Sequence, residues 1–414
     1  MLKKLLLLAI LHSPVAGTSA LADAISDWNE KTVAFVTSRP MSPPQAERVM
    51  AMVHAAMFDA VNSIERRYRP LLVQLPSAPT TSKEVAAAVA ASTVLARLHP
   101  VASGEHKSAL TAYLTAIPPS NAKTDGIRLG ELVAARIIDA RANDGSNATD
   151  TYRPKARPGV YVPTATTVGA VWPELKPFVI GTGSQFRPQP PVALKSDEWA
   201  ADYNEIKALG SRNSTKRSAR QTEDARFWLS PGPVIYYPVV RQLAVAKKLD
   251  LVDTARFMAL IAVARSDAFI AVFDAKYHYD FWRPVTAIRN GDNDDNPATE
   301  RDAAWMPIAD TPMHPEYPCA HCIMSGTIAS IVEALFGTAD FPEFNLTSPT
   351  APGVTHRWTN VWTFSNEVSD ARIWAGFHYR FSTRVGQEMG RSVGQYVVNT
   401  AMRPVATADA LSRK

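Results

Sequence analysis

Apolar residues recur at three- and four-residue steps along most of this chain, which is the spacing of amphipathic helices. Strand-like alternation is scarce, and only "GVYVPTATTV" at 159–168 is predicted to be extended. The pattern therefore predicts an all-α, bundle-like fold. The clearest predicted helices are 43–68, 82–99, 124–144, 197–209, 252–282, 325–336 and 384–402.

Two long segments without this periodicity interrupt the helices. The first, 150–195, contains eight prolines, and the second, 290–320, follows the longest predicted helix. Loops of this length in a compact protein are usually functional or disordered. Because helices flank both segments, we expect one helical body over 23–414, with the loops folded across it.

The first 22 residues have the layout of a secretory signal peptide, with an early pair of lysines, a short apolar run and small residues before Asp23. The apolar run of about ten residues is too short to span a bilayer. The longest apolar segment elsewhere, 257–273, is broken by Arg265 and Asp267. We therefore expect an exported, periplasmic or secreted protein that is not an integral membrane protein.

Charge argues against nucleic acid as a partner. The formal net charge is +5, and it falls to +3 without the two leader lysines, with no run of basic residues. With 46% apolar residues the chain can bury a large core. Nothing in the sequence sets the oligomeric state.

Candidate chemistry begins with "PEYPCAHC" at 315–322, where the only two cysteines flank His321. A zinc site would need a second ligand pair, and a thiol-redox motif would be expected beside a βαβ pattern. Neither is evident. A disulfide between Cys319 and Cys322 stays open at this stage, because an exported protein permits it.

Two cations stand at the end of the longest predicted helix. Lys276 and Arg283 are seven residues apart, close to two helical turns, so both are expected on one face. Pro284 places Arg283 at or near the helix end. Two neighbouring cations suit an anion between them; alternatively, Lys276 pairs with Asp280 and Arg283 is solvated.

A second basic pair follows later. Arg372 and His378 are six residues apart, which an ideal helix would separate by about 120°. Arg372 is therefore expected to precede the helix or to approach a pocket from the side. Taken alone, His378 fits a packing histidine as well as a ligand.

Together, Lys-x6-Arg-Pro, Pro-x-x-His and Arg-x5-His occur in this order over 276–378. The set resembles the signature of the vanadium-dependent haloperoxidases and the related PAP2-type acid phosphatases, written K-x6-RP, PSGH and SR-x5-H. The resemblance implies the helical-bundle fold of that superfamily. It also implies a bound tetrahedral oxyanion: vanadate in a haloperoxidase, or phosphate in a phosphatase.

The resemblance also assigns the anion-binding residues. Lys276, Arg283 and Arg372 would neutralise the oxyanion's oxygens by charge-assisted hydrogen bonds. Backbone N–H groups near Ala320 would add donors if a helix starts after Pro318.

Two histidines would carry the chemistry. By resemblance, His378 would coordinate the metal through one ring nitrogen, and its other nitrogen would need an acceptor that fixes the tautomer. His321 would be the general acid/base, and Lys276 would assist the reaction. Hydrogen peroxide and halide would give hypohalous acid, with a small organic molecule as acceptor. In a phosphatase, His378 would instead become a phosphohistidine during hydrolysis of a phosphate monoester.

Departures from the signature leave alternatives open. Cys319 and Ala320 replace its serine and glycine, and Ala371 replaces the serine before the arginine. Ser382 stands where phosphatases commonly carry aspartate, which favours the haloperoxidase. The alternatives are an acid phosphatase and a non-catalytic oxyanion-binding protein with a degraded site.

Two weaker hypotheses concern residues near these motifs. Tyr277, Trp282 and Trp374 either shape the substrate side of the pocket or pack in the core. The acidic run from Asp292 to Asn296 is better explained as a solvated loop, although it could bind a stabilising calcium ion.

Overall fold

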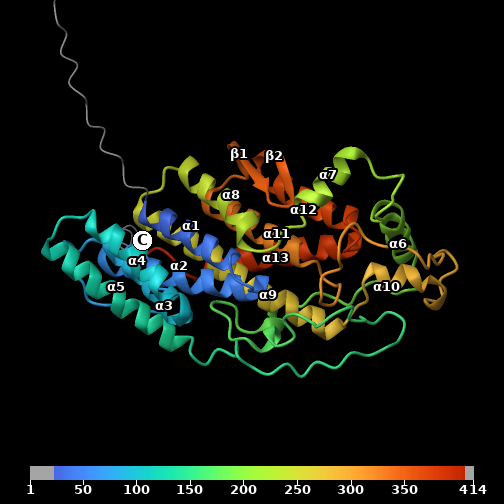
Figure 1. Cartoon of the computed structure of the whole chain (residues 1–414), viewed down its shortest axis with the longest axis horizontal. Coiled ribbons are helices and arrows are strands. Elements are labelled where there is room, and N and C mark those ends of the chain that lie inside the picture. Colours follow the sequence, from blue (N-terminus) through green and yellow to red (C-terminus); the bar gives the residue numbers. More distant parts are fainter. Residues whose placement is uncertain (1–22, 406–414) are drawn as a thin grey trace, which may run out of the picture.

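The structure, a computed structural model, describes residues 23–405 and is mostly helical (Figure 1). The predicted signal peptide, 1–22, lies outside the described residues. The α-helices are α1 (Ala24–Thr37), α2 (Pro43–Glu65), α3 (Lys83–Leu98), α4 (Ser103–Thr115), α5 (Asn121–Ala140), α6 (Asp197–Leu209), α7 (Ala219–Phe227), α8 (Pro233–Ala246), α9 (Leu251–Tyr279), α10 (Pro284–Arg289), α11 (Ala320–Phe336), α12 (Val361–Trp374) and α13 (Arg380–Thr400). Short 3-10 turns are Pro100–Ala102, Trp172–Glu174, Gly183–Phe186 and Gly291–Asn293.

The long helix α9 runs through the middle of the molecule. Figure 1 shows α3, α4 and α5 at one end and α6 and α10 at the other, with α11 and α13 beside the central part. A large continuous apolar cluster draws residues from α2, α3, α9, α11 and α13. Helix α9 is buried along most of its length, which explains why its apolar residues surround the helix instead of forming one stripe. The predicted all-α fold is confirmed.

Local sequence signals set the helix boundaries around the site. At α2, Ser42 and Gln45 form a capping box, with prolines in the first turn. Helix α9 ends at Tyr279, and its C-cap residue, Asp280, adopts a left-handed conformation with φ 51°. Arg283 is extended because Pro284 follows it, and it is the N-cap residue of α10. Arg283 therefore lies beyond the helix that carries Lys276, and not on one face of it as the spacing suggested.

One β-hairpin was not predicted from the sequence. Strands β1 (Asp340–Ser348) and β2 (Ala351–Asn360) pair antiparallel, with register shifts after Asp340 and before Ser348. Pro342 and these shifts interrupt strict alternation, so the pattern was hard to read from the sequence. Conversely, the segment 159–168 forms only an isolated bridge between Val160 and Phe281, so the extended prediction there holds for one residue pair.

The irregular segments are folded against the helices, as expected. The first, between α5 and α6, crosses α9, where the carboxylate of buried Asp267 accepts hydrogen bonds from the amides of Phe178, Val179 and Ile180. The second joins α10 to α11. Among the described residues, no helix is long and apolar enough to cross a membrane. Whether 23–414 is one domain stays a prediction.

Candidate functional site

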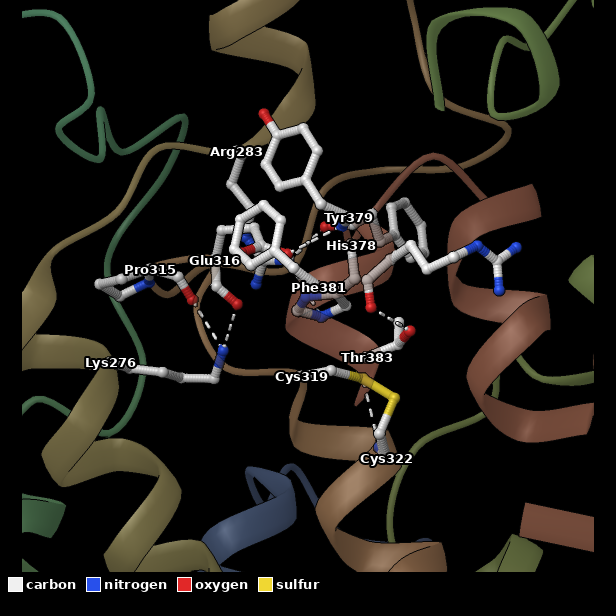
Figure 2. A network of polar contacts seen from close by, with 12 residues as sticks. Lys276, Arg283, Pro315, Glu316, Cys319, Cys322, His378, Tyr379, Phe381 and Thr383 are labelled. Atoms are coloured by element: carbon white, nitrogen blue, oxygen red, sulfur yellow. Dashed lines mark hydrogen bonds and ion pairs between the residues drawn. A yellow bond between two sulfur atoms is a disulfide. The ribbon is translucent and has the colours of Figure 1, made fainter. Parts of the chain in front are cut away.

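The string at 315–322 forms the entry to α11. Cys319 is the N-cap residue, and its sulfur accepts a hydrogen bond from the amide of Cys322. The two cysteines are joined in a disulfide, which the sequence had left open (Figure 2). The helix starts at Ala320, as the oxyanion hypothesis required, so His321 stands in its first turn. Backbone N–H groups at such a helix start favour an anion.

Arg372 and His378 flank a break between two helices. Arg372 lies in the last turn of α12, so of the two predicted placements it has the approach to a pocket from the side, and His378 follows the break at Gly376. Gly376 has φ +81°, and a Cβ there would lie 2.5 Å from the backbone oxygen of Gly210. The carbonyl of Arg372 accepts from the amides of Phe377 and His378. This turn directs both side chains into one pocket.

The ring of His378 is held by two charged neighbours (Figure 2). Its Nδ1 lies 2.8 Å from Oε1 of Glu316, and its Nε2 lies 3.3 Å from Nη1 of Arg283. A guanidinium can only donate, so Nε2 is the acceptor and the ring proton belongs on Nδ1, where it donates to Glu316. Nε2 is therefore the unprotonated nitrogen, and the lone pair that accepts from Arg283 here is the one that a metal ligand or nucleophile would use.

Lys276 and Arg283 hold the backbone segments next to His378 through hydrogen bonds to carbonyl groups. Nζ of Lys276 donates to the carbonyls of Pro315 and Glu316, at 2.9 and 2.7 Å. Arg283 donates from Nε to the carbonyl of His314 at 2.9 Å and from Nη1 to that of Phe377 at 3.0 Å. The alternative pairing of Lys276 with Asp280 does not occur: Nζ of Lys276 donates to the carbonyls of Pro315 and Glu316, and Asp280 accepts from the Tyr152 hydroxyl.

A cavity of about 450 Å³ lies in front of these residues. Of the six sequence-predicted residues, Ala320, His321, Arg372 and His378 line it, whereas Lys276 and Arg283 do not. The four come from two distant parts of the chain, the start of α11 and the junction of α12 and α13. Direct contact of Lys276 and Arg283 with an anion stays a prediction, and Nη1 of Arg283 reaches to 3.3 Å from Nε2 of His378.

The site has more buried positive charge than negative charge. Lys276, Arg283 and Arg372 are each at most 1% exposed. Within residues 23–405, none of the three has a carboxylate oxygen within 4.0 Å. Burial, opposed by neighbouring tyrosine and glutamate, lowers the pKa of Arg283 to about 10, and burial lowers that of Arg372 to about 9. Burial followed by repulsion from Arg283 holds the pKa of Lys276 well below its usual value. Such a cluster is stabilised by a bound anion.

His321 and His378 are neutral because burial and neighbouring positive charges disfavour their protonated forms. Burial, then the positive charge of Arg372, lowers the pKa of His321 well below its usual range. Burial, then Arg283, does the same for His378. Burial raises the pKa of Glu316 to about 7, partly offset by Lys276 and Arg283.

The donors that remain fit a tetrahedral oxyanion. Nε of Arg372 and Nε2 of His321 are buried and have no hydrogen-bond partner in the part of the chain that the structure describes. Both residues line the cavity that His378 also lines. A guanidinium and a helix start offer donors from different directions, the neutral ring of His321 offers a nitrogen that can exchange a proton, and His378 offers a lone pair. This set can hold one phosphate-sized anion and coordinate its central atom.

Three residues of the site were missed in the sequence. Glu316, the acceptor that the tautomer of His378 requires, stands within the quoted string as a lone acid. His314 lines the cavity and accepts from Arg283 at 3.0 Å through Nδ1. Arg265 also lines it, ion-paired with Glu47. Its spacing of eleven residues from Lys276, about three helical turns, was the available signal.

The aromatic residues proposed for the substrate side pack elsewhere. Trp282 belongs to a separate buried cluster, and Trp374 is partly buried and packs against that cluster and its neighbours. The hydroxyl of Tyr277 donates to the carbonyl of Val168, which lines the cavity. The core alternative is therefore correct for Trp282. The apolar wall of the cavity is formed instead by Phe269, Phe273, Met313, Met324 and Phe377.

Comparison with known proteins gives consistent matches. Residues 256–407 match the family model described as the VCPO second helical-bundle domain. The vanadium chloroperoxidase of Curvularia inaequalis is 27% identical over 272 residues, covering 49% of this chain and 44% of that protein. The chain thus matches less than half the length of that curated relative.

Solved structures resemble the fold over most of the chain. A bacterial vanadium-dependent iodoperoxidase has a TM-score of 0.79 and 23% identity, covering 93% of this chain and 98% of that one. The holo form of a bacterial vanadium-dependent chloroperoxidase has a TM-score of 0.71 and 17% identity, covering 89% and 94%. At these identities the structural likeness establishes the fold alone.

Proposed function

We propose that the chain is a member of the vanadium-dependent haloperoxidase family and that it oxidises halide with hydrogen peroxide to hypohalous acid, which its similarity to the second helical-bundle domain of that family supports. The vanadate would sit in the cavity between His378, His321 and Arg372. The observation that carries the proposal is the pair of buried, unpartnered nitrogens on Arg372 and His321, which face the same cavity as His378 within the described chain. The relatives described above are all haloperoxidases, which favours this activity over a phosphatase or a non-catalytic protein.

Each residue has a distinct proposed task. Nε2 of His378 would be the metal ligand, and Glu316 keeps the proton on Nδ1 so that Nε2 stays unprotonated. Arg372 would stabilise the anion's oxygens directly. Arg283 and Lys276 would add positive charge and fix the backbone at 314–316.

His321 is the proposed acid/base. Its neutral ring can take a proton from peroxide as peroxide binds, and return it to the leaving oxygen. Bound vanadate would supply a Lewis-acid centre that activates peroxide. The protein's contribution is a buried, pre-arranged set of donors that needs little rearrangement during the reaction.

The apolar lining of the cavity favours the proposal that a small organic molecule accepts the halogen. Besides its polar end, the cavity is lined by apolar side chains, among them Phe269, Phe273, Met313 and Met324. Such a wall suits a small apolar or aromatic molecule beside the site of halide oxidation. We propose that a phenol-like acceptor is halogenated there.

The test is halide oxidation by protein stripped of phosphate and reloaded with orthovanadate. We expect vanadate-dependent, peroxide-dependent halogenation of a phenol-type dye by the wild type. The halogenation activity of His378→Ala should be at least about 100-fold lower than that of the wild type, because a metal ligand is lost. The matched control is His278→Ala, an exposed histidine near the end of α9, which should retain full activity.

Other outcomes would redirect the assignment. Hydrolysis of p-nitrophenyl phosphate that vanadate inhibits, without halogenation, would identify a phosphatase. Vanadate binding without either turnover would identify a binding protein. Equal vanadium content and turnover in wild type and His378→Ala would refute the site.

We also propose that the protein is exported. The Cys319–Cys322 disulfide supports an oxidising compartment. N-terminal sequencing of protein from the periplasm or medium should begin at Asp23; an intact leader on active cytoplasmic protein would contradict export.

A further inference from the structure

Away from the cavity, three metal-binding side chains meet between α7 and the β-hairpin. Glu223 and Asp224 lie in the middle of α7, and His356 lies on β2. Their ligand atoms are all within 4.8 Å of one another. Nε2 of His356 is 3.6 Å from Oε1 of Glu223 and 3.6 Å from Oδ1 of Asp224. These separations are too long for direct hydrogen bonds but close to those between ligands of one metal ion.

The imidazole of His356 is fixed so that one nitrogen faces the two carboxylates. Its ring stacks on Phe227, with centroids 3.9 Å apart and planes 4° apart. Its Nδ1 lies 2.6 Å from Oε1 of Glu367 on α12. The residue is 2% exposed, and its Nε2 has no hydrogen-bond partner among residues 23–405. A histidine held by a carboxylate on one nitrogen, with the other free, is the usual arrangement of a metal-ligating histidine.

We propose that Glu223, Asp224 and His356 bind a divalent transition-metal ion, with zinc as the best match. Tetrahedral zinc with ligands at about 2.0–2.1 Å separates its ligand atoms by about 3.4 Å, which agrees with the two 3.6 Å distances. One imidazole and two carboxylates supply three ligands, and water would complete the shell.

The charges around the cluster support a cation. The carboxylates of Glu223, Asp224 and Glu367 all lie near the ring of His356. Three carboxylates thus gather around one imidazole. Arg220 meets part of this charge, with Nε 2.8 Å from Oδ1 of Asp224 and Nη1 3.2 Å from Oε1 of Glu223. The side chain of Arg220 is 60% exposed, so it can swing into solvent when a metal takes the same oxygens.

A metal ion at this site would stabilise one wall of the cavity that Arg372 and His378 line. Glu367 also accepts from the indole N–H of Trp228, and the carbonyl of Trp228 accepts from Nη1 of Arg372. A metal held by α7 and β2 would therefore fix the strand and helix that position Trp228. The site is proposed as structural, and it goes beyond the proposed halide oxidation.

The experiment is a zinc titration of the EDTA-dialysed full-length protein by calorimetry, with bound zinc counted by elemental analysis. We expect one equivalent to bind the wild type. His356→Gln and Asp224→Asn should each weaken this binding at least 100-fold, and Glu367→Gln should weaken it 10- to 100-fold because it only orients the imidazole. His378→Ala should leave the stoichiometry unchanged, which separates this site from the histidines of the cavity.

Arg220→Gln distinguishes a metal site from a plain ion-pair cluster. If a metal binds, removing the competing guanidinium should tighten zinc binding several-fold. If the cluster exists only to pair with Arg220, this variant should melt earlier and bind no zinc. The proposal is overturned by a wild type that binds no zinc, or by equal affinity in the wild type and a folded His356→Gln protein.

Discussion

At the scale of single residues, the site is defined by buried charge that protein groups do not balance. His378 and Glu316 form a pair, but Arg283 and Arg372 have no carboxylate of their own in the described chain. The motif residues could be found in the sequence because their types and spacing match a family signature. Glu316 could not, because an isolated glutamate carries no signal until its contact with His378 is known.

Glu316→Gln tests the role of this carboxylate as a positioning residue. The amide can still accept from Nδ1 of His378 but has no charge, so we expect vanadate affinity or turnover to fall 10- to 100-fold. Steady-state halogenation over a range of vanadate concentrations measures both. The activity–pH profile should also change near pH 7, where Glu316 titrates, which a merely structural defect would not cause.

Glu300→Gln is the matched control for this variant. The side chain of Glu300 is 92% exposed, so its activity and pH profile should equal those of the wild type. A Glu316→Gln protein with unaltered vanadate affinity, turnover and pH profile would show that the contact with His378 is not needed.

At the scale of elements, strong periodicity predicted the long helices and weaker patterns were missed. Helix α6 was predicted with its observed bounds, and α2, α3 and α9 to within a few residues. Helix α8 carries an internal proline, Pro238, which hides its pattern. The hairpin β1–β2 was missed because its register shifts break the alternation.

Gly376→Ala tests the turn that brings Arg372 and His378 together. Alanine is strained at φ +81°, and its Cβ would lie 2.5 Å from the Gly210 carbonyl and 2.9 Å from Pro307. We expect a loss of unfolding free energy of about 2–4 kcal/mol, together with reduced vanadate binding. Urea unfolding and vanadate titration measure the two effects.

Gly353→Ala is the control, because Gly353 has nearly the same φ of +82° but no atom within 4 Å of an added Cβ among the described residues. It should lose only about 1 kcal/mol. Equal losses in the two variants would mean that the contact with Gly210 has no importance.

At the scale of the whole molecule, polar contacts join helices that are distant in the sequence. Arg241 of α8 donates to Oδ1 of Asn29 on α1 at 2.7 Å. This orients the Asn29 amide to donate to Nε2 of His54 on α2 at 2.8 Å. Since Nε2 is an acceptor here, protonating His54 would break the chain of contacts. Burial lowers the pKa of His54 to about 3, with a further contribution from Arg241.

This arrangement predicts that the folded protein loses stability as the pH becomes acidic. Below the unfolded pKa of 6.5 and above about 3, the unfolded chain binds a proton that the folded chain does not. Stability should therefore fall as pH drops through this window, by about 1.4 kcal/mol per pH unit from this group, and be unaffected above it. Urea unfolding from pH 7.5 to 4.5 should show a shallower decline for His54→Gln than for the wild type.

The control is His278→Gln, whose exposed side chain should leave the wild-type slope unchanged. Identical slopes for His54→Gln and the wild type would show that His54 does not remain neutral in the folded protein.

The sequence by itself determined the class of fold and the candidate chemistry. Helical periodicity depends on neighbours within a few residues, and the signature at 276–378 depends on residue types and spacing, so both can be read along the chain. The tertiary structure decided which of these side chains face the cavity. It set Lys276 and Arg283 behind the cavity, supplied Glu316 to His378, and gathered Glu223, Asp224 and His356. Such contacts arise from the packing of elements that are distant in the sequence, so patterns among neighbouring residues cannot predict them.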